Sequence, residues 1–273
     1  MKSTIKTVVL GTALLSVSVS SLFAHRAWIL PSTSVLSGDS PWVSFDAAIS
    51  NDLFFPNHHA MGTESIKVIS PSGAEVEKQF ENDGHIRSSF EIQLEEKGTY
   101  LINRDRLGYF ASWEEEGEAK RWRGDLEEFK AEGLAEKEGI ELTESSSKTV
   151  TYVTNGAPDT KALEPTGKGL EIKFTDSHPN DLFTGEEATF TFVLDGKPVE
   201  GVEVFVQKGN DRFRDSPNPI EGLTTSEGTF SFTVEEAGRY WLTASISAEA
   251  GEKEGVPFKQ RASYTATFEV LPL

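Results

Sequence analysis

Three histidines near the start of the chain carry the clearest chemistry in this sequence. His25 follows a leader-like segment, residues 1–24, while His58 and His59 are adjacent in a stretch with Pro and Asn that is typical of a loop. Imidazole nitrogens suit borderline transition metals such as Cu(II) and Ni(II). Cleavage after Ala24 adds the free α-amine of His25, and an imidazole from His58 or His59 then completes a three-nitrogen set. The alternative is two surface loop histidines and a cleavage point that precedes a histidine by chance.

Residues 1–24 have the parts of a secretory signal peptide. Two lysines make a positive start, and residues 7–22 form an apolar run that is too short to span a bilayer comfortably. Ala24 is a small residue at the expected cleavage position, so we expect the mature protein to begin at His25. Cleavage after Ser21 is the alternative, and it leaves His25 without a free amine.

Other side chains near these histidines, or flanked by acids, are further candidate ligands. Asp46 and Asp52 lie close to the histidine pair in sequence, as a fourth ligand or as acceptors that orient an imidazole. His178 stands between two acids in the stretch 176–181, which makes it the next metal candidate. The alternative for His178, which we favour, is a turn residue near the interface between two domains.

Charge and composition exclude several classes of protein. Removal of residues 1–24 takes away two of the 26 basic residues and none of the 44 acidic ones, so the formal net charge falls from −18 to −20. Such a field repels nucleic acid and anionic lipid. Cysteine is absent, which excludes disulfides, thiolate ligands and a lipoprotein anchor. No second hydrophobic stretch approaches the length of a membrane span. We expect a soluble periplasmic protein that binds no nucleic acid and does not insert into the membrane after signal removal.

An internal repeat predicts the fold. Residues 90–102 (FEIQLEEKGTYLI) align without gaps on residues 230–242 (FSFTVEEAGRYWL). In both segments apolar and polar residues alternate with the two-residue period of a half-buried strand, and a Glu-Glu-x-Gly turn follows. Tyr100 and Tyr240 then begin a second strand. We therefore expect an all-β protein of two immunoglobulin-like β-sandwich domains, in which the two tyrosines hold equivalent positions.

Turn-forming residues place the domain boundaries. We expect a first sandwich over residues 25–153, a linker rich in Gly, Pro and Asn over 154–168, and a second sandwich over 169–273. The stretch 113–139 breaks the strand pattern, because it is charged and predicts a helical or irregular excursion that covers a site or caps a sheet edge. Its apolar residues recur at roughly helical spacing, at Trp122, Leu126, Phe129 and Leu134.

Several stretches of the chain resemble a known bacterial family. The most specific are the Ala-His-x-x-Trp opening at residues 24–28 and the His-Pro-Asn-Asp element at 178–181. The chain is similar to a periplasmic family of uncharacterised function that is often labelled the periplasmic component of a cobalt or nickel ABC-type uptake system. This resemblance implies an exported β-sandwich protein associated with divalent metals. It extends over nearly the whole mature chain, through residues 24–32, 45–56, 166–171, 178–182, 195–198 and 264–270.

These observations together predict a non-enzymatic periplasmic protein that binds a divalent transition metal ion (nickel, cobalt or copper) and serves its uptake or delivery beside a membrane transporter component. The chain has no Gly-x-Ser-x-Gly elbow and no Gly-rich phosphate loop. One alternative is a structural or ligand-binding β-sandwich module without a metal. Another is a copper monooxygenase that uses the three-nitrogen histidine brace. The candidate metal ligands are His25, His58, His59 and His178.

Overall fold

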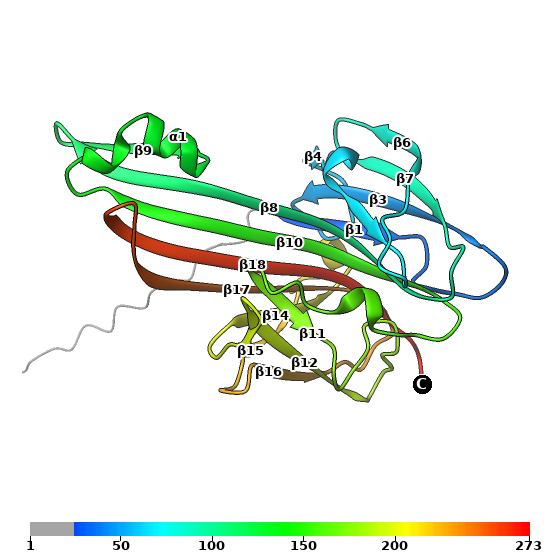
Figure 1. Ribbon diagram of the computed structural model, residues 1–273. Coiled ribbons are helices and arrows are strands. Elements are labelled where there is room, and N and C mark those ends of the chain that lie inside the picture. Colours follow the sequence, from blue (N-terminus) through cyan, green and yellow to red (C-terminus); the bar gives the residue numbers. More distant parts are fainter. Residues whose placement is uncertain (1–24) are drawn as a thin grey trace, which may run out of the picture.

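The alternation of apolar and polar residues becomes β-strand along most of the chain. A computed structural model describes residues 25–273, so the predicted signal peptide, residues 1–24, lies outside the described residues. Within 25–273 the strands form one long sheet and two smaller sheets, one on each side of it (Figure 1). The prediction of an all-β, sandwich-type fold is confirmed.

The first small sheet is antiparallel and has the order β1-β3-β7-β6, with β4 paired to β3. Inward-facing Val43, Phe45 and Phe90 form a core with Tyr100 and Ile102 from the long sheet. The strands are β1 (Arg26–Pro31), β3 (Trp42–Ser50), β4 (His59–Ala60), β6 (Gln79–Asp83) and β7 (Ser88–Gln93).

The long sheet contains strands from both halves of the sequence, in the order β15-β14-β17-β18-β10-β8-β5. Along this path every neighbouring pair is antiparallel except β10 with β18, which run parallel. In addition β2 pairs with β10 and β9 with β8. The strands are β2 (Val35–Leu36), β5 (Lys67–Ile69), β8 (Gly98–Glu115), β9 (Glu118–Gly124), β10 (Glu141–Asn155), β14 (Glu203–Lys208), β15 (Ile220–Leu223), β17 (Gly238–Lys253) and β18 (Val256–Val270).

The second small sheet covers the opposite face of the long sheet (Figure 1). Helices are short, and none among residues 25–273 is long and apolar enough to cross a membrane. The strands are β11 (Leu170–Lys173), β12 (Glu187–Leu194), β13 (Lys197–Pro198) and β16 (Thr229–Thr233). The helical turns are α1 (Leu126–Ala131) and the 3₁₀ segments η1 (Thr63–Ser65), η2 (Leu134–Glu136), η3 (Lys161–Leu163) and η4 (Asp211–Phe213).

Strand β10 contributes side chains to both cores. Val150 and Tyr152 pack in the core under the second small sheet, whereas Val153 packs in the core of the first. Successive side chains of a strand point to opposite faces, so the two small sheets must lie on opposite sides of β10. The two sandwiches are therefore joined edge to edge through β10 and β18 and share one sheet.

Tyr100 and Tyr240 do occupy equivalent positions in the two halves. Each is the third residue of its strand, β8 or β17, and each follows the turn from β7 or β16. The Tyr100 hydroxyl donates to the Glu96 carbonyl at 3.2 Å, and the Tyr240 hydroxyl donates to the Glu236 carbonyl at 2.6 Å. A tyrosine that bonds back to the corner before its strand is a hallmark of immunoglobulin-like sandwiches. The repeat in the sequence therefore marks the same corner twice.

The charged stretch 113–139 differs from the expected excursion. Its first part is a β-hairpin made by the end of β8 and β9, and only the short segments α1 and η2 are helical. Asp125 caps α1 by accepting from the Glu128 backbone N–H, and the Glu128 side chain accepts from the Asp125 backbone N–H in return. Trp122 and Phe129 nevertheless pack in one cluster. Their spacing looked helical because a strand and a helix converge on the same apolar cluster.

The expected linker, 154–168, is also packed against the rest of the protein. Thr154 and Asn155 are fully buried inside β10, and the Asn155 side-chain amide donates to the Leu94 carbonyl at 3.0 Å. Leu163 lies in the second core. The breakers of this segment turn the chain around the edge of the sheet and do not separate two independent bodies.

Removal of either corner hydroxyl should destabilise the protein. Tyr100→Phe and Tyr240→Phe each delete a hydrogen bond to a backbone carbonyl while keeping the buried ring, so we expect the free energy of unfolding to fall by about 1 kcal/mol in each variant. Urea denaturation followed by tryptophan fluorescence measures this loss. Unchanged stability in both variants would show that these corners do not hold the turns.

Candidate functional site

The three histidines predicted from the sequence meet at one place on the surface. His25 precedes β1, and its exposed ring stacks on the ring of His58, with centroids 4.0 Å apart and planes 3° from parallel. The His59 ring centroid lies 4.9 Å from that of His58, at an interplanar angle of 52°. Residues that are more than thirty positions apart in the chain are thus brought together by the pairing of β1 with β3 and by the loop that follows β3.

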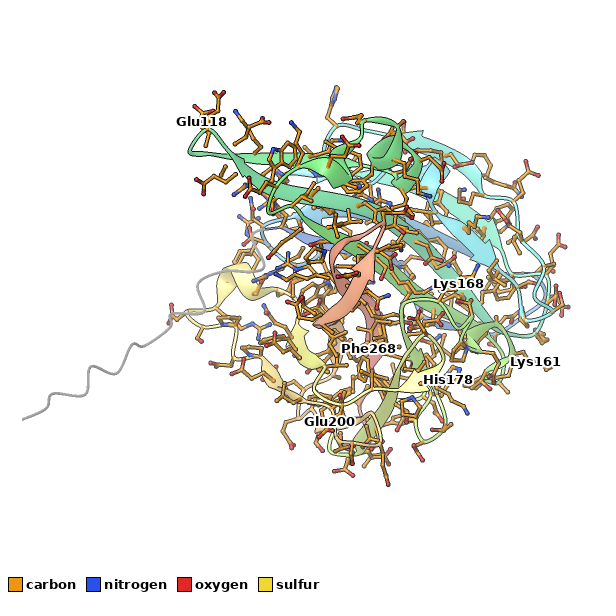
Figure 2. All side chains as sticks on the ribbon, turned by 60° about the vertical axis from the view of Figure 1, so that its left-hand side comes forward. Glu118, Lys161, Lys168, His178, Glu200 and Phe268 are labelled. Carbon is orange, nitrogen blue, oxygen red and sulfur yellow. The ribbon has the colours of Figure 1, made fainter. Side chains whose placement is uncertain are left out.

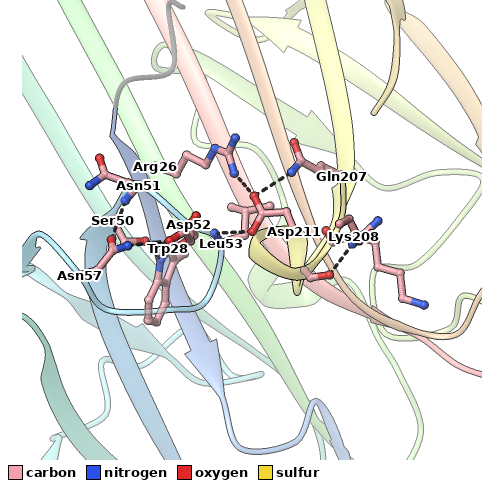
Figure 3. Close-up of polar contacts among 12 residues, drawn as sticks. Arg26, Trp28, Ser50, Asn51, Asp52, Leu53, Asn57, Gln207, Lys208 and Asp211 are labelled. Carbon is pink, nitrogen blue, oxygen red and sulfur yellow. Dashed lines mark hydrogen bonds and ion pairs between the residues drawn. The ribbon is translucent and has the colours of Figure 1, made fainter. Parts of the chain in front are cut away.

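Hydrogen bonds fix the loop that carries His58. The Trp28 indole N–H donates to Ser50 Oγ at 2.7 Å, and Ser50 Oγ donates to the Asp52 carbonyl at 2.6 Å. The Asn57 side chain closes the loop, since its Oδ1 accepts from the Asn51 backbone N–H at 2.9 Å and its Nδ2 donates to Asp52 Oδ2 at 2.7 Å (Figure 3). Asp52, a candidate ligand in the sequence, instead holds the loop in shape.

Asp46 is likewise engaged elsewhere. Its carboxylate lies 3.2 Å from the Arg87 guanidinium in an ion pair on the surface of the first small sheet. His59 Nδ1 lies 2.9 Å from the carbonyl of the next residue, Ala60, which leaves Nε2 as its free ring nitrogen. Of the candidate side-chain ligands near His25, only the imidazoles of His58 and His59 therefore remain.

The second half of the chain anchors the start of β1. Asp211, nearly buried, forms an ion pair with the Arg26 guanidinium. The other oxygen of the same carboxylate accepts from the Leu53 backbone N–H at 3.1 Å (Figure 3). Gln207 Nε2 also donates to Asp211, at 3.0 Å. One acid of the second half thus holds both the residue after His25 and the loop that leads to His58.

The stacked rings are close enough for a chelate but do not form one as they stand. An imidazole lone pair lies in the ring plane, so two parallel rings 4.0 Å apart cannot both point at one ion about 2 Å from each nitrogen. Among residues 25–273, no group of three or more His, Asp or Glu side chains is arranged to hold a metal. Metal binding by these histidines therefore requires at least one ring to turn. His25 and His58 are exposed, so rotamer changes are unhindered by a core.

The surroundings of His58 favour its neutral imidazole. Partial desolvation, with the neighbouring His25 and His59 rings, lowers the pKa of His58 below its usual value. Only a neutral imidazole offers a lone pair to a metal, so the lowered pKa of His58 favours the form of this ring that can bind a metal.

His178 occupies a different place and has a structural role. In Figure 2 it lies far from Glu118, which is at the tip of the β8–β9 hairpin. Its Nδ1 accepts from the Asn180 backbone N–H at 3.1 Å, so the proton is on Nε2, which is 3.0 Å from the Asp159 carbonyl. Both ring nitrogens are thus hydrogen-bonded within the protein. This geometry favours the second interpretation in the sequence analysis, a turn residue at the junction of the two halves.

Burial lowers the pKa of His178, which predicts a pH dependence of stability. The unfolded chain protonates near pH 6.5, but the folded chain resists protonation to a lower pH, so the free energy of unfolding falls as the pH drops below about 6.5. His178→Asn keeps an acceptor near the Nδ1 position and cannot titrate. We expect it to be about 1 kcal/mol less stable at pH 7.5 and to lose less stability than the wild type between pH 7.5 and 5.5.

Urea denaturation in the presence of EDTA measures both quantities. His85→Asn, which removes an exposed histidine, is the matched control and should keep the pH profile of the wild type. A His178→Asn profile parallel to that of the wild type would mean that His178 is not the titrating group.

Two parts of this region were not predicted from the sequence. Asp211 lies in a polar loop with no pattern that marks it as an anchor. A groove of about 780 Å³ opens beside His25 and is lined by Arg104 and Arg106. The sequence did contain one signal for the two arginines. Arg104 and Arg106 are two positions apart in a strand, and residues i and i+2 of a strand share one face.

The topology and the two tyrosine corners define an immunoglobulin-like β-sandwich protein with a histidine cluster at the start of its first strand. The chain belongs to the family described as Domain of unknown function (DUF4198), whose model matches residues 22–248. The prediction of an uncharacterised domain family is confirmed. No curated protein matches the sequence.

Solved structures resemble the chain only distantly. The D0-D1 domain of intimin is 11% identical with a TM-score of 0.21, and the match covers 86% of this chain and 96% of that one. A DUF4785 family protein from Legionella pneumophila is 8% identical with a TM-score of 0.24, over 79% and 50% of the two chains. A D1-D4 ectodomain fragment of ICAM-5 is 8% identical with a TM-score of 0.20, over 90% and 51%. Similarity at this level carries no functional meaning.

Proposed function

We propose that the mature protein is a non-enzymatic, exported binding protein for a divalent transition metal ion (nickel, cobalt or copper). The observation that carries the proposal is the contact between His25 and His58, whose rings stack at 4.0 Å although three strands separate them in sequence. Cleavage after Ala24 places a free α-amine on His25. Amine, His25 imidazole and His58 imidazole then supply three nitrogen ligands, with His59 as the alternative third.

The surroundings of the cluster support this role. Asp211 fixes Arg26, the residue that follows the chelating one, and the Asn57 amide fixes the loop immediately before His58. Supporting contacts of this kind set the orientation of metal ligands and commonly change affinity by about 10- to 100-fold. The proposed role is an accessory of metal uptake or delivery in the periplasm, beside a membrane transporter component. No residue is proposed to act in catalysis.

The amine and the imidazole of His25 can be tested separately. Protein that begins at His25, verified by intact mass, should bind Cu(II) or Ni(II) in calorimetric titration. Both His25→Ala and a single extra residue before His25 should weaken binding by more than about 100-fold, because the first deletes the ring and the second converts the amine into an amide. His85→Ala is the control and should bind as the wild type does.

The pH dependence gives an independent check. Affinity should decrease as the pH falls below about 6.5, because protons then compete for the imidazoles and, over a wider range, for the amine. Tight binding that survives both His25→Ala and the extension would place the metal elsewhere. Absence of binding by correctly processed protein would instead favour a metal-free, ligand-binding module, for which the groove beside His25 is the specific structural feature.

A further inference from the structure

The groove beside His25 lies on the exposed part of one face of the long sheet. Farther along the strands, the first small sheet covers this same face, and its edge forms one wall with His25, Ala27 and Ile49. The opposite face of the sheet is filled by the second core. The volume of about 780 Å³ falls within the range of small-molecule sites.

Small hydroxyl side chains form the floor of the groove. Three adjacent strands (β17, β18 and β10) each contribute two of them, and the strand register aligns these in two rows. Thr243 and Thr149 are nearly buried, so the floor is fixed by the sheet beneath it. The first row is Thr243, Thr265 and Thr149, and the second is Ser245, Ser263 and Ser147.

The rows end on basic side chains at strand β8. Arg104 is in register with Thr149, and Arg106 is in register with Ser147. Arg104 is half-buried and donates from Nε to Ser65 Oγ at 2.8 Å, while neither guanidinium takes part in an ion pair within residues 25–273. Burial and the charge of Arg106 lower the pKa of Arg104, and the nearby Glu64 carboxylate only partly opposes this shift. This end of the groove therefore favours an anion.

The other end of the rows is acidic. Glu203 of β14 is in register with Ser245, and Glu221 of β15 is in register with Phe205 of β14. Both carboxylates line the groove, and neither is ion-paired within the part of the chain that the structure describes. Phe205 and Leu223 also line this end of the groove. Opposite charges are thus separated at the two ends of one groove and do not neutralise each other.

The distance between the two ends sets the length of a ligand. Strands β14 and β8 are four strand spacings apart in the sheet, which at about 4.8 Å each gives about 19 Å between backbones. Extended peptide advances about 3.3–3.6 Å per residue, so four residues cover about 14 Å. The long Arg and Glu side chains span the difference between these two lengths.

We propose that this groove binds a short extended peptide, with its C-terminal carboxylate on Arg104 and Arg106 and its N-terminal ammonium at Glu203 and Glu221. Guanidinium groups form two-pronged hydrogen bonds with a carboxylate. The Ser and Thr hydroxyls of the floor both donate and accept, which matches the alternating N–H and C=O groups of a peptide. Apolar side chains of the peptide contact Phe205 and Ile49.

This peptide site goes beyond the proposed metal function and does not depend on it. His25 contributes to the wall, but none of the charged groups at the two ends belongs to the histidine cluster. Peptide binding can therefore be measured in EDTA, and the result stands whether or not the protein binds a metal.

Tetra-alanine is a suitable probe because its side chains add no charge. In calorimetric titration at pH 7 we expect it to bind. C-terminal amidation and N-terminal acetylation should each weaken binding by at least about tenfold, since each removes one charge-assisted contact. In Arg104→Gln/Arg106→Gln the free acid and the amide should bind equally. In Glu203→Gln/Glu221→Gln the free amine and the acetylated form should bind equally.

Matched controls carry the same changes of charge away from the groove. Arg121→Gln/Arg123→Gln on β9 and Glu186→Gln/Glu187→Gln at the start of β12 should keep the wild-type preference for both free termini. Thermal unfolding of each variant checks that it is folded.

Several outcomes would overturn the peptide site. These are equal binding of blocked and free tetra-alanine by the wild type, binding of glutarate as tight as that of the peptide, and absence of binding for tri-, tetra- and penta-alanine at millimolar concentration. Concentration-dependent self-association that Arg104→Gln/Arg106→Gln abolishes would assign the groove to a second copy of this chain instead.

Discussion

The parallel pairing of β10 with β18 joins the two halves of this protein into one long sheet. From Thr149 to Asn155 every residue of β10 is buried, because a small sheet packs near each face and strands pair with both edges. Tyr152 shows directly how the two halves pack together. It belongs to the first half of the chain, yet its hydroxyl lies inside the second core, 2.6 Å from the hydroxyl of Tyr264. The second core therefore contains side chains from both halves of the chain, whereas the first core is formed by residues of the first half.

The same pairing creates the surface on which the candidate sites lie. Joining two sandwiches through a shared sheet, with their small sheets on opposite faces, leaves part of each long face uncovered. The first small sheet then meets the second half along this face, where the Trp241 indole N–H donates to the Ala27 carbonyl at 3.0 Å. His25 and the groove lie at this junction, so contacts between the halves position both.

Local patterns in the sequence predicted the local parts of the structure. The aligned repeat located Tyr100 and Tyr240, and the Pro- and Asn-containing stretch before His58 correctly indicated a loop. The shared sheet could not be predicted, because alternation identifies a strand but not its partner, and parallel partners here come from opposite halves. The prediction for residues 113–139 was imprecise for a similar reason. The spacing of their apolar residues looked helical, but these residues come from a hairpin and a helix that pack in one cluster. The groove combines Arg104 with Glu203, and no pattern within one strand connects them.

The sequence separation between β10 and β18 determines when the protein can finish folding. Thr151 and Thr267, which share a hydrogen bond across this pair, are 116 residues apart, and β18 follows all the other strands of residues 25–273. A chain that emerges from its N-terminus exposes one edge of β10 until the final strand arrives, and such distant pairings form slowly. The second core therefore closes only after β18 has been added. A truncation within β18 leaves that core unfinished and also uncovers an edge of β10, a strand that packs against the first core as well.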